Sequence, residues 1–129
     1  MPNITHLNPD TMSQPRGFSN VVKAGNTVYI AGQVAGSRDG SVVGKGDAEA
    51  QVRQIWHNIE AAVKSVGGTL HNVVKTTTYV TSLNHAGAVR KVREELFPSN
   101  PPTSTLLVVS GLASPDYLVE IEAIAVVDA

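Results

Sequence analysis

The sequence has no cysteine among its 129 residues. Disulfides, thiolate metal sites and a cysteine nucleophile are therefore excluded together. Charged residues make up 16% of the chain, which is below the roughly 25% of typical soluble domains. Ten Lys and Arg residues are balanced by eleven Asp and Glu residues. Because there is no basic excess to pair with phosphates, we do not expect binding to nucleic acid that is driven by charge.

Long hydrophobic runs are also missing. No apolar segment approaches the roughly 20 residues that a membrane helix needs, and residues 1–6 have neither the basic stretch nor the apolar run of a secretory signal. We therefore expect a cytoplasmic protein that does not bind a membrane. The length suits one compact domain. The low charge predicts that another copy of the chain covers part of its surface.

The hydrophobic pattern predicts the element order β-β-α-β-α-β-β. Residues 1–16 are polar and lack periodicity, so we expect a loosely attached N-terminal arm followed by one domain over residues 17–129. Asp47 and Asn84 are the expected N-caps of the two helices. Strands are expected at 18–23, 27–31, 73–81, 104–109 and 118–127, and helices at 48–66 and 85–97.

Both predicted helices are hydrophobic on one side only. We therefore expect an α+β fold in which the two helices lie together on one face of a single mixed sheet. No third helix is left for the opposite face, so oligomerisation is the expected cover for it.

The last predicted strand carries two carboxylates on a hydrophobic surface. Alternation places Glu120 and Glu122 on one side of the strand, among leucine, isoleucine and valine. Two interpretations are open. Either both carboxylates face solvent on an open sheet, or neighbouring subunits enclose them and at least one is a functional acid or base. The side expected to meet the helices carries Val119, Ile121, Ala123, Ala125 and Val127.

Other polar residues give weaker indications. Ser104 and Thr105 follow two prolines, either as turn residues or as hydroxyls that face a pocket. Arg90 and Glu94 have the spacing of an ordinary surface ion pair on a helix. The four histidines lie far apart, which does not favour a metal site. The glycine-rich segment 40–46 lacks the spacing and the Ser or Thr of a phosphate-binding loop.

Three segments match family motifs in order and spacing. Residues 31–34 (Ala-Gly-Gln-Val), 73–77 (Val-Val-Lys-Thr-Thr) and 119–126 (Val-Glu-Ile-Glu-Ala-Ile-Ala-Val) resemble motifs of the Rid (YjgF) family of enamine/imine deaminases. The resemblance covers roughly residues 17–127. It implies a chorismate-mutase-like α+β fold and a homotrimer whose three sheets form a central barrel with clefts between subunits. It also implies that enamines or imines such as 2-aminoacrylate are hydrolysed to a keto acid and ammonia, without a metal or cofactor.

The resemblance assigns site residues, and three of them depart from the family pattern. Glu120 matches the family's water-positioning carboxylate, and Gly32 matches its cleft glycine. Ser104 stands where the family has the arginine that binds the substrate carboxylate, Phe18 where it has a tyrosine, and Arg90 where it has an asparagine. A hydroxyl does not replace a bidentate contact between arginine and carboxylate.

We therefore expect a cofactor-independent hydrolase of an enamine, imine or related C–N substrate, in which Glu120 is catalytic. Three explanations of the missing arginine are open. Arg90 supplies the charge from another wall, the substrate lacks that carboxylate, or the cleft no longer catalyses this reaction. A ligand-binding or chaperone-like trimer without catalysis is the alternative, and a lyase or isomerase on the same scaffold is a third hypothesis. The expected substrate-binding residues are Phe18, Gly32, Arg90, Ser104 and Thr105.

Overall fold

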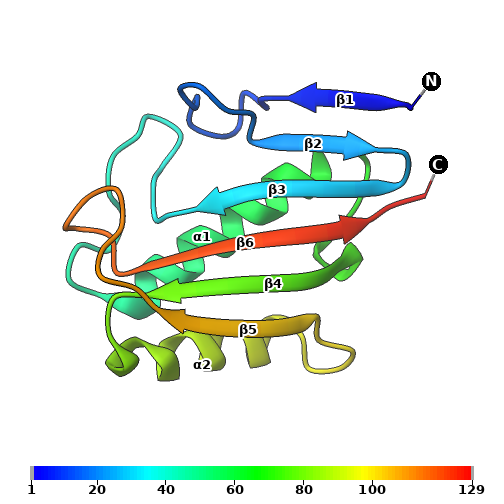
Figure 1. Ribbon diagram of the computed structural model, residues 1–129. Helices are drawn as coiled ribbons and strands as arrows, with labels where there is room; N and C mark the ends of the chain where they lie inside the picture. Colours follow the sequence, from blue (N-terminus) through cyan, green and yellow to red (C-terminus); the bar gives the residue numbers. More distant parts are fainter. Residues whose placement is uncertain (1, 129) are drawn as a thin grey trace.

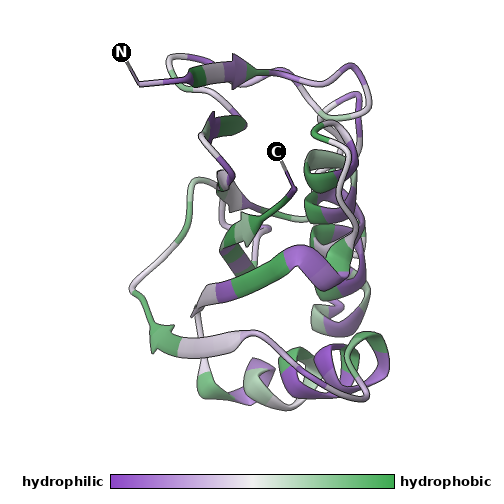
Figure 2. Ribbon diagram, turned by 90° about the vertical axis from the view of Figure 1, so that its right-hand side faces the viewer, coloured by the Kyte–Doolittle hydropathy of each residue, from purple (hydrophilic) through white to green (hydrophobic). Residues whose placement is uncertain are grey.

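Six strands form one mixed sheet, with the order β1-β2-β3-β6-β4-β5, in a computed structural model that describes residues 2–128. The strands are β1 Ile4–Leu7, β2 Val21–Ala24, β3 Thr27–Gln33, β4 Val73–Val80, β5 Thr103–Val108 and β6 Val119–Val126. Helices α1 (Ala48–Lys64) and α2 (Ala86–Leu96) lie behind the sheet in Figure 1, and Figure 2 shows them together on one face. The expected α+β fold with two helices on one side of a mixed sheet is confirmed.

Helix α1 begins at Ala48 as predicted and ends at Lys64, two residues before the predicted end at 66. The Asp47 side chain accepts a hydrogen bond of 3.1 Å from the Ala50 backbone N–H, which satisfies one of the unpaired donors of the first turn. At the other end, Gly67 adopts a φ of 82°, a value that favours glycine. The Gly68 N–H then donates to the Val63 carbonyl and closes the helix.

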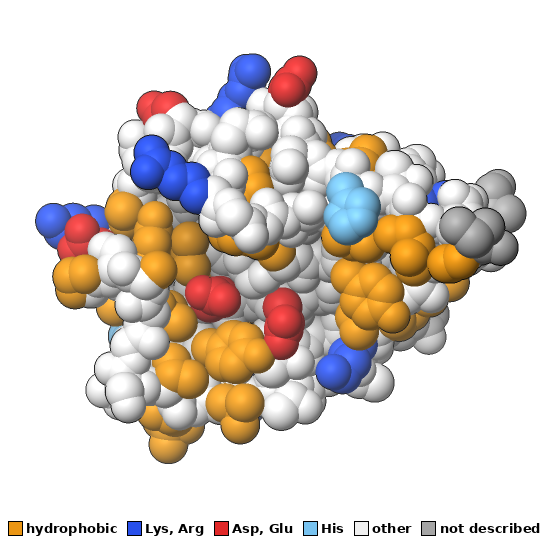
Figure 3. Space-filling model, turned by 45° about the horizontal axis from the view of Figure 1, so that its top comes forward, with side chains coloured by type: hydrophobic (Ala, Val, Ile, Leu, Met, Phe, Trp, Pro, Cys, Tyr) orange, Lys and Arg blue, Asp and Glu red, His pale blue; other side chains and the backbone are white. Residues whose placement is uncertain are grey.

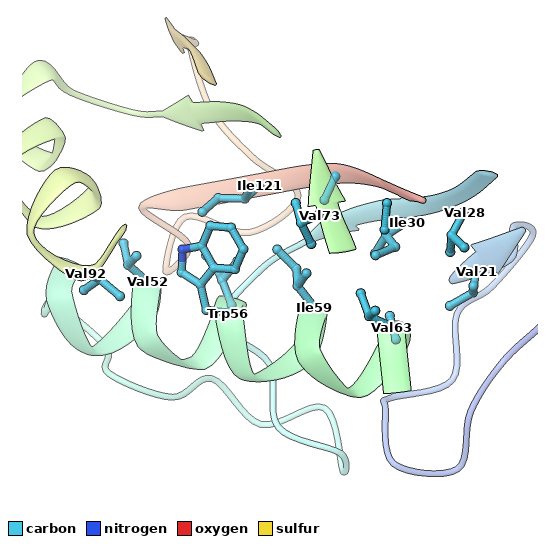
Figure 4. Packing of buried hydrophobic residues seen from close by; sticks show 14 of the residues in the cluster. Val21, Val28, Ile30, Val52, Trp56, Ile59, Val63, Val73, Val92 and Ile121 are labelled. Atoms are coloured by element: carbon cyan, nitrogen blue, oxygen red, sulfur yellow. The ribbon is translucent and has the colours of Figure 1, made fainter. Parts of the chain in front are cut away.

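The core lies between α1 and the sheet. Figure 4 shows side chains of α1, including Val52, Trp56 and Ile59, packed beneath side chains of the strands. Ile59 and Val52 are completely buried, and burying a side chain of this kind stabilises the fold by roughly 1.5–3 kcal/mol. The predicted helix-facing side of the last strand is confirmed, since all five residues of that list are buried.

The opposite side of the sheet, here called the uncovered face, carries no helix of residues 2–128 (Figure 2). Strand register assigns its side chains, because paired residues point to the same side. Tyr79 pairs with Glu120, and Thr77 pairs with Glu122. Hydrophobic side chains stay exposed there, with Tyr29 50% and Leu107 47% exposed. This face is therefore apolar with a polar centre.

The N-terminal arm differs from our expectation of loose attachment. Ile4–Leu7 form the edge strand β1, which pairs antiparallel with β2. Met12 is only 3% exposed, and the Asn8 side chain accepts a hydrogen bond of 2.9 Å from the Asn20 backbone N–H. An edge strand whose side chains are mostly exposed has no hydrophobic alternation, so the sequence pattern did not reveal it.

The start of the second helix also differs from the prediction. Asn84 was the expected N-cap, but it lies within a short 3-10 helix, η2 (Leu83–His85), and α2 begins only at Ala86. The Ser82 hydroxyl accepts from the Asn84 N–H at 3.1 Å and caps this turn. Serine and asparagine are both good caps, and the structure uses the earlier of the two. A second 3-10 helix, η1 (Leu70–Asn72), precedes β4.

Candidate functional site

A bulge in β3 shapes the centre of the uncovered face. Ile30 pairs with Ala123 and Gln33 pairs with Ile121, so β3 has one extra residue opposite β6. Bulges of this kind re-aim side chains and are common beside active sites. Gly32 lies in the bulge, directly against the Glu120 carboxylate. A Cβ at position 32 would lie 2.9 Å from the Glu120 Cδ, so the absence of a side chain makes room for the carboxylate.

Glu120 is a half-buried carboxylate on an otherwise apolar surface. Burial raises its pKa above the ordinary 4.5, and the negative charge of Glu122 raises it further. Within residues 2–128, no side chain donates a hydrogen bond to Glu120 or forms an ion pair with it. A carboxyl group with a raised pKa exchanges protons more readily near neutral pH, as a general acid or base must do.

Glu122 has a partner of its own. The Tyr79 hydroxyl donates a hydrogen bond of 2.6 Å to Glu122 Oε1, and this bond raises the pKa of Tyr79. Since Tyr79 is directly opposite Glu120 in register, the contact crosses diagonally from β4 to β6. The sequence analysis missed Tyr79, although the alternation of residues 73–80 would have placed it on this face.

A hollow of about 310 Å³ opens on the uncovered face beside Glu122. Figure 3, which looks onto this side of the molecule, shows acidic side chains in the middle of hydrophobic ones. Glu120 does not line the hollow, but it lies on the same face only two residues from Glu122. The lining residues are Ser19, Tyr29, Ile30, Ala31, Lys75, Thr77, Glu122, Ala123 and Ile124.

Two more of the expected site residues lie near this face. Phe18 is 57% exposed and immediately precedes Ser19, which lines the hollow. Thr105 pairs with Thr77, so its side chain belongs to the uncovered face at the edge strand β5. With Gly32 and Glu120, four of the six expected site residues lie on or next to the same side of one chain.

Ser104 and Arg90 do not lie on this face of their own chain. Ser104 pairs with Thr76, which is buried on the helix side. The Ser104 hydroxyl receives a hydrogen bond of 2.9 Å from Nη1 of Arg93 in α2. Arg90 is exposed on the same helix. The guanidinium that contacts the serine is therefore Arg93, a residue that the sequence analysis did not single out.

No metal-binding cluster exists in the part of the chain that the structure describes, where no three His, Asp or Glu side chains come close enough to hold an ion. Nor does any helix within residues 2–128 have the length and hydrophobicity to cross a membrane.

Comparison with known proteins shows the family of the chain. A family model described as "Endoribonuclease L-PSP" matches residues 10–127. The chain belongs to this Rid (YjgF) family. A RutC family protein of Pyrococcus horikoshii is 38% identical over 109 residues, which are 84% of this chain and 85% of that protein.

Solved structures of Rid proteins share the fold. A Rid family protein of unknown function from Yersinia pestis has a TM-score of 0.90 at 30% identity, covering 97% of this chain and all of that one. RidA from an Antarctic Psychrobacter has a TM-score of 0.89 at 28% identity, covering 95% and 99% of the two chains. The resemblance found in the sequence is therefore confirmed at the level of family and fold.

Proposed function

We propose that this Rid-family chain is a cofactor-independent hydrolase of an enamine, imine or related C–N centre, with Glu120 as its general base and acid. The observation that carries the proposal is that the Glu120 carboxylate is half-buried against Gly32. Burial raises the pKa of this carboxyl group. A carboxyl group in this environment can hold a water and take its proton. The description of the matching family names an endoribonuclease, so hydrolysis of a C–N centre and cleavage of RNA are both to be tested.

In the proposed reaction Glu120 carries the proton of the attacking water. An enamine first takes a proton from solvent on carbon and becomes an iminium ion. The Glu120 carboxylate then removes a proton from water as the water oxygen forms a bond to the iminium carbon. Glu120 passes this proton to the amine nitrogen, the C–N bond breaks, and the remaining hydroxyl proton returns to solvent as the carbonyl forms. The products are a ketone and ammonia, with no change of oxidation state.

A homotrimer in the cytoplasm is the proposed working form. Two observations favour oligomerisation through the uncovered face: apolar side chains are exposed there, and the chain has few charged residues. Gly32, Phe18 and Thr105 would then line a cleft from one subunit. Ser104 and Arg90, which belong to the helix side, would contribute to a cleft only from a neighbouring subunit.

Ser104 in place of the family arginine implies a substrate unlike the usual small imino acids. We expect negligible ammonia release from 2-aminoacrylate generated in situ, because a serine hydroxyl does not bind a carboxylate as a guanidinium does. Robust turnover of 2-aminoacrylate would contradict this expectation. The variants Arg90→Ala and Arg93→Ala would then identify the cation that has taken over.

The direct test is a panel of imines, enamines and amino-muconate-type compounds assayed for ammonia release. At least one should be hydrolysed, and Glu120→Gln should lower that rate by about 10²-fold or more, the scale of general acid–base catalysis. Glu94→Gln, on the exposed side of α2, is the matched control and should change nothing. Equal rates for Glu120→Gln and the unmodified chain would remove Glu120 from the mechanism.

The same panel separates the alternatives. Binding of panel compounds without turnover by any of them would favour a ligand-binding trimer. Cleavage of single-stranded RNA by the purified chain would support the ribonuclease activity that the family description names. Against RNA stands the charge of the face, since only Lys23 and Lys75 among the Lys and Arg residues lie in its strands.

A further inference from the structure

Within residues 2–128, Lys75 is the only Lys or Arg of a strand whose side chain lies on the uncovered face. Just two of the ten Lys and Arg residues lie in strands, Lys23 in β2 and Lys75 in β4. Lys23 pairs with Val28, which is completely buried on the helix side. Lys75 pairs with Ile124 and lines the hollow. The hollow thus contains one amine, and no other strand supplies a second.

The ammonium group of Lys75 is not used by the fold. Five ion pairs exist among the described residues, and none includes Lys75. Glu122 is its diagonal neighbour across the strands, but Tyr79 holds Oε1 of that carboxylate. The hydroxyls of Ser19 and Thr77 line the same hollow. An ammonium and two hydroxyls around one cavity are donors that suit an anionic group such as a carboxylate.

Strand register sets how far this cation lies from the proposed catalytic carboxylate. Glu120 is opposite Tyr79, whereas Lys75 is opposite Ile124. These two residue pairs are four residues apart along each strand, which is about 13 Å at about 3.3 Å per residue. A carboxylate attached directly to the C–N carbon would lie beside Glu120 and would not reach Lys75. Only a carboxylate several bonds away from that carbon can reach it.

We infer that the substrate is a small dipolar molecule whose C–N centre meets Glu120 and whose distal carboxylate meets Lys75 in the hollow. The inference rests on the proposed function and adds the substrate class. The carboxylate of Glu120 at one end favours the positive iminium nitrogen, and the ammonium group of Lys75 at the other end favours the anion. Glu122 lies between these two positions, with Oε1 bonded to the Tyr79 hydroxyl. The side chains of Tyr29 and Ile124 supply apolar walls for the part of the substrate between its C–N centre and its carboxylate.

The test uses oxo acids, which are products of such a reaction, in equilibrium binding measured by calorimetry at pH 7. Pyruvate, 4-oxopentanoate and 6-oxoheptanoate place the carboxylate at increasing distance from the carbonyl, and 2-heptanone is the neutral analogue of the longest. Lys75→Met should weaken 6-oxoheptanoate binding about tenfold, the scale of a charged hydrogen bond. Lys75→Arg should restore it, while pyruvate and 2-heptanone should be unaffected.

Lys23→Met is the matched control and should bind every compound as the unmodified chain does. A second measurement needs no variant, because added salt should weaken binding of 6-oxoheptanoate and not of 2-heptanone. Unchanged binding of 6-oxoheptanoate by Lys75→Met would overturn the inference, as would failure of the unmodified chain to bind any oxo acid more tightly than 2-heptanone.

The two proposals fail separately. If Glu120→Gln abolishes ammonia release while Lys75→Met binds every oxo acid normally, the hydrolase stands and the distal-carboxylate site is lost. If oxo acids bind through Lys75 but no C–N compound is hydrolysed, the binding site stands and the reaction assigned to Glu120 is lost.

Discussion

The pKa of Glu120 depends on the residues that surround it. The bulge in β3 brings Gly32 against it, and the resulting burial opposes its negative charge. A carboxylate two residues away, Glu122, is exposed and is held by Tyr79 instead. Two glutamates on one strand therefore have different surroundings: Glu120 is half-buried against Gly32, and Glu122 is exposed and held by a hydrogen bond.

The raised pKa of Glu120 predicts a pH-dependent effect on stability. Its folded-state pKa lies above the unfolded value of 4.5, so this group stabilises the fold below about pH 4.5 and loses that contribution as the pH rises through the folded pKa. Glu120→Gln removes the cost of burying the charge. We expect the variant to be more stable at pH 7, by at most about 1 kcal/mol because the group is half-exposed.

Urea denaturation at pH 7 and pH 4, at one protein concentration, measures this difference. The gain should be present at pH 7 and largely lost at pH 4, where the carboxyl group is mostly protonated in both states. Glu94→Gln should show no gain at either pH. A Glu120→Gln variant less stable than the unmodified chain at pH 7 would contradict the assigned burial.

Gly32→Ala should impair activity with little effect on folding. The backbone of Gly32 does not have a positive φ, so alanine fits its conformation, but the new Cβ would meet the Glu120 carboxylate. The carboxylate must move, and we expect kcat/KM to fall by about 10-fold or more while the melting temperature changes by only a few degrees. Full activity in Gly32→Ala would show that the carboxylate position is not critical.

At the scale of elements, α1 allows the contribution of an N-cap hydrogen bond to stability to be measured. Asp47 caps the helix through the Ala50 N–H. Asp47→Ala should lower the free energy of unfolding by about 1 kcal/mol, and Asp47→Ser, which keeps a capping oxygen, should lower it much less. Thermal unfolding of the three chains measures both changes. An equal loss in the two variants would mean that the cap bond does not stabilise the helix.

Periodic elements were predicted from sequence, and elements made by backbone pairing were not. The stripe of α1 and the alternation of β6 are visible in the sequence because burial on one side repeats along them. Strand β1 and the bulge at Gly32 have no such signature, since each is defined by what its partner strand does. The predicted N-cap at Asn84 was wrong because Ser82 caps a 3-10 turn ahead of α2, Asn84 lies within that turn, and His85 at the start of α2 makes no side-chain cap bond.

The site residues that lie in sequence motifs were predicted, and the contacts that depend on the pairing of elements were not. Motif resemblance identified Glu120 and Gly32, and the structure places them in contact. The pair formed by Tyr79 and Glu122 depends on diagonal geometry between strands, which requires the register of the sheet. The contact of Arg93 with Ser104 joins α2 to an edge strand, and no local pattern in the sequence indicates it.

At the scale of the whole molecule, the two sides differ in their surface: the helix side carries ion pairs, and the uncovered face carries exposed apolar side chains. Ion pairs cross between α1 and α2 on the outer surface, where Arg53 contacts Glu95 at 2.8 Å and Lys91 contacts Glu49 at 2.9 Å. These pairs lower the pKa of both carboxylates, so their contribution is present above about pH 4.5 and is lost as the pH falls. Among residues 2–128 no ion pair lies on the uncovered face, and apolar side chains stay exposed there.

We expect sedimentation equilibrium to give three times the chain mass of 13.6 kDa. Leu107, on the uncovered face, should lie between subunits, so Leu107→Asp should shift the mass toward that of the single chain by placing a charge there. Leu83→Asp is the matched control, because Leu83 is 68% exposed in η2. A monomer for the unmodified chain would contradict the proposed enclosure of the face.

The dependence of kcat/KM on pH tests the central claim most directly, because it reports the protonation of the essential group in the free enzyme. With a substrate found in the panel, the unmodified chain should lose activity on the acid side with an apparent pKa above 4.5, the value that Glu120 would have in open water. Glu120→Gln should lack this limb and retain at most about a hundredth of the rate. The same acid limb and the same rate in Glu120→Gln would show that another group does the chemistry.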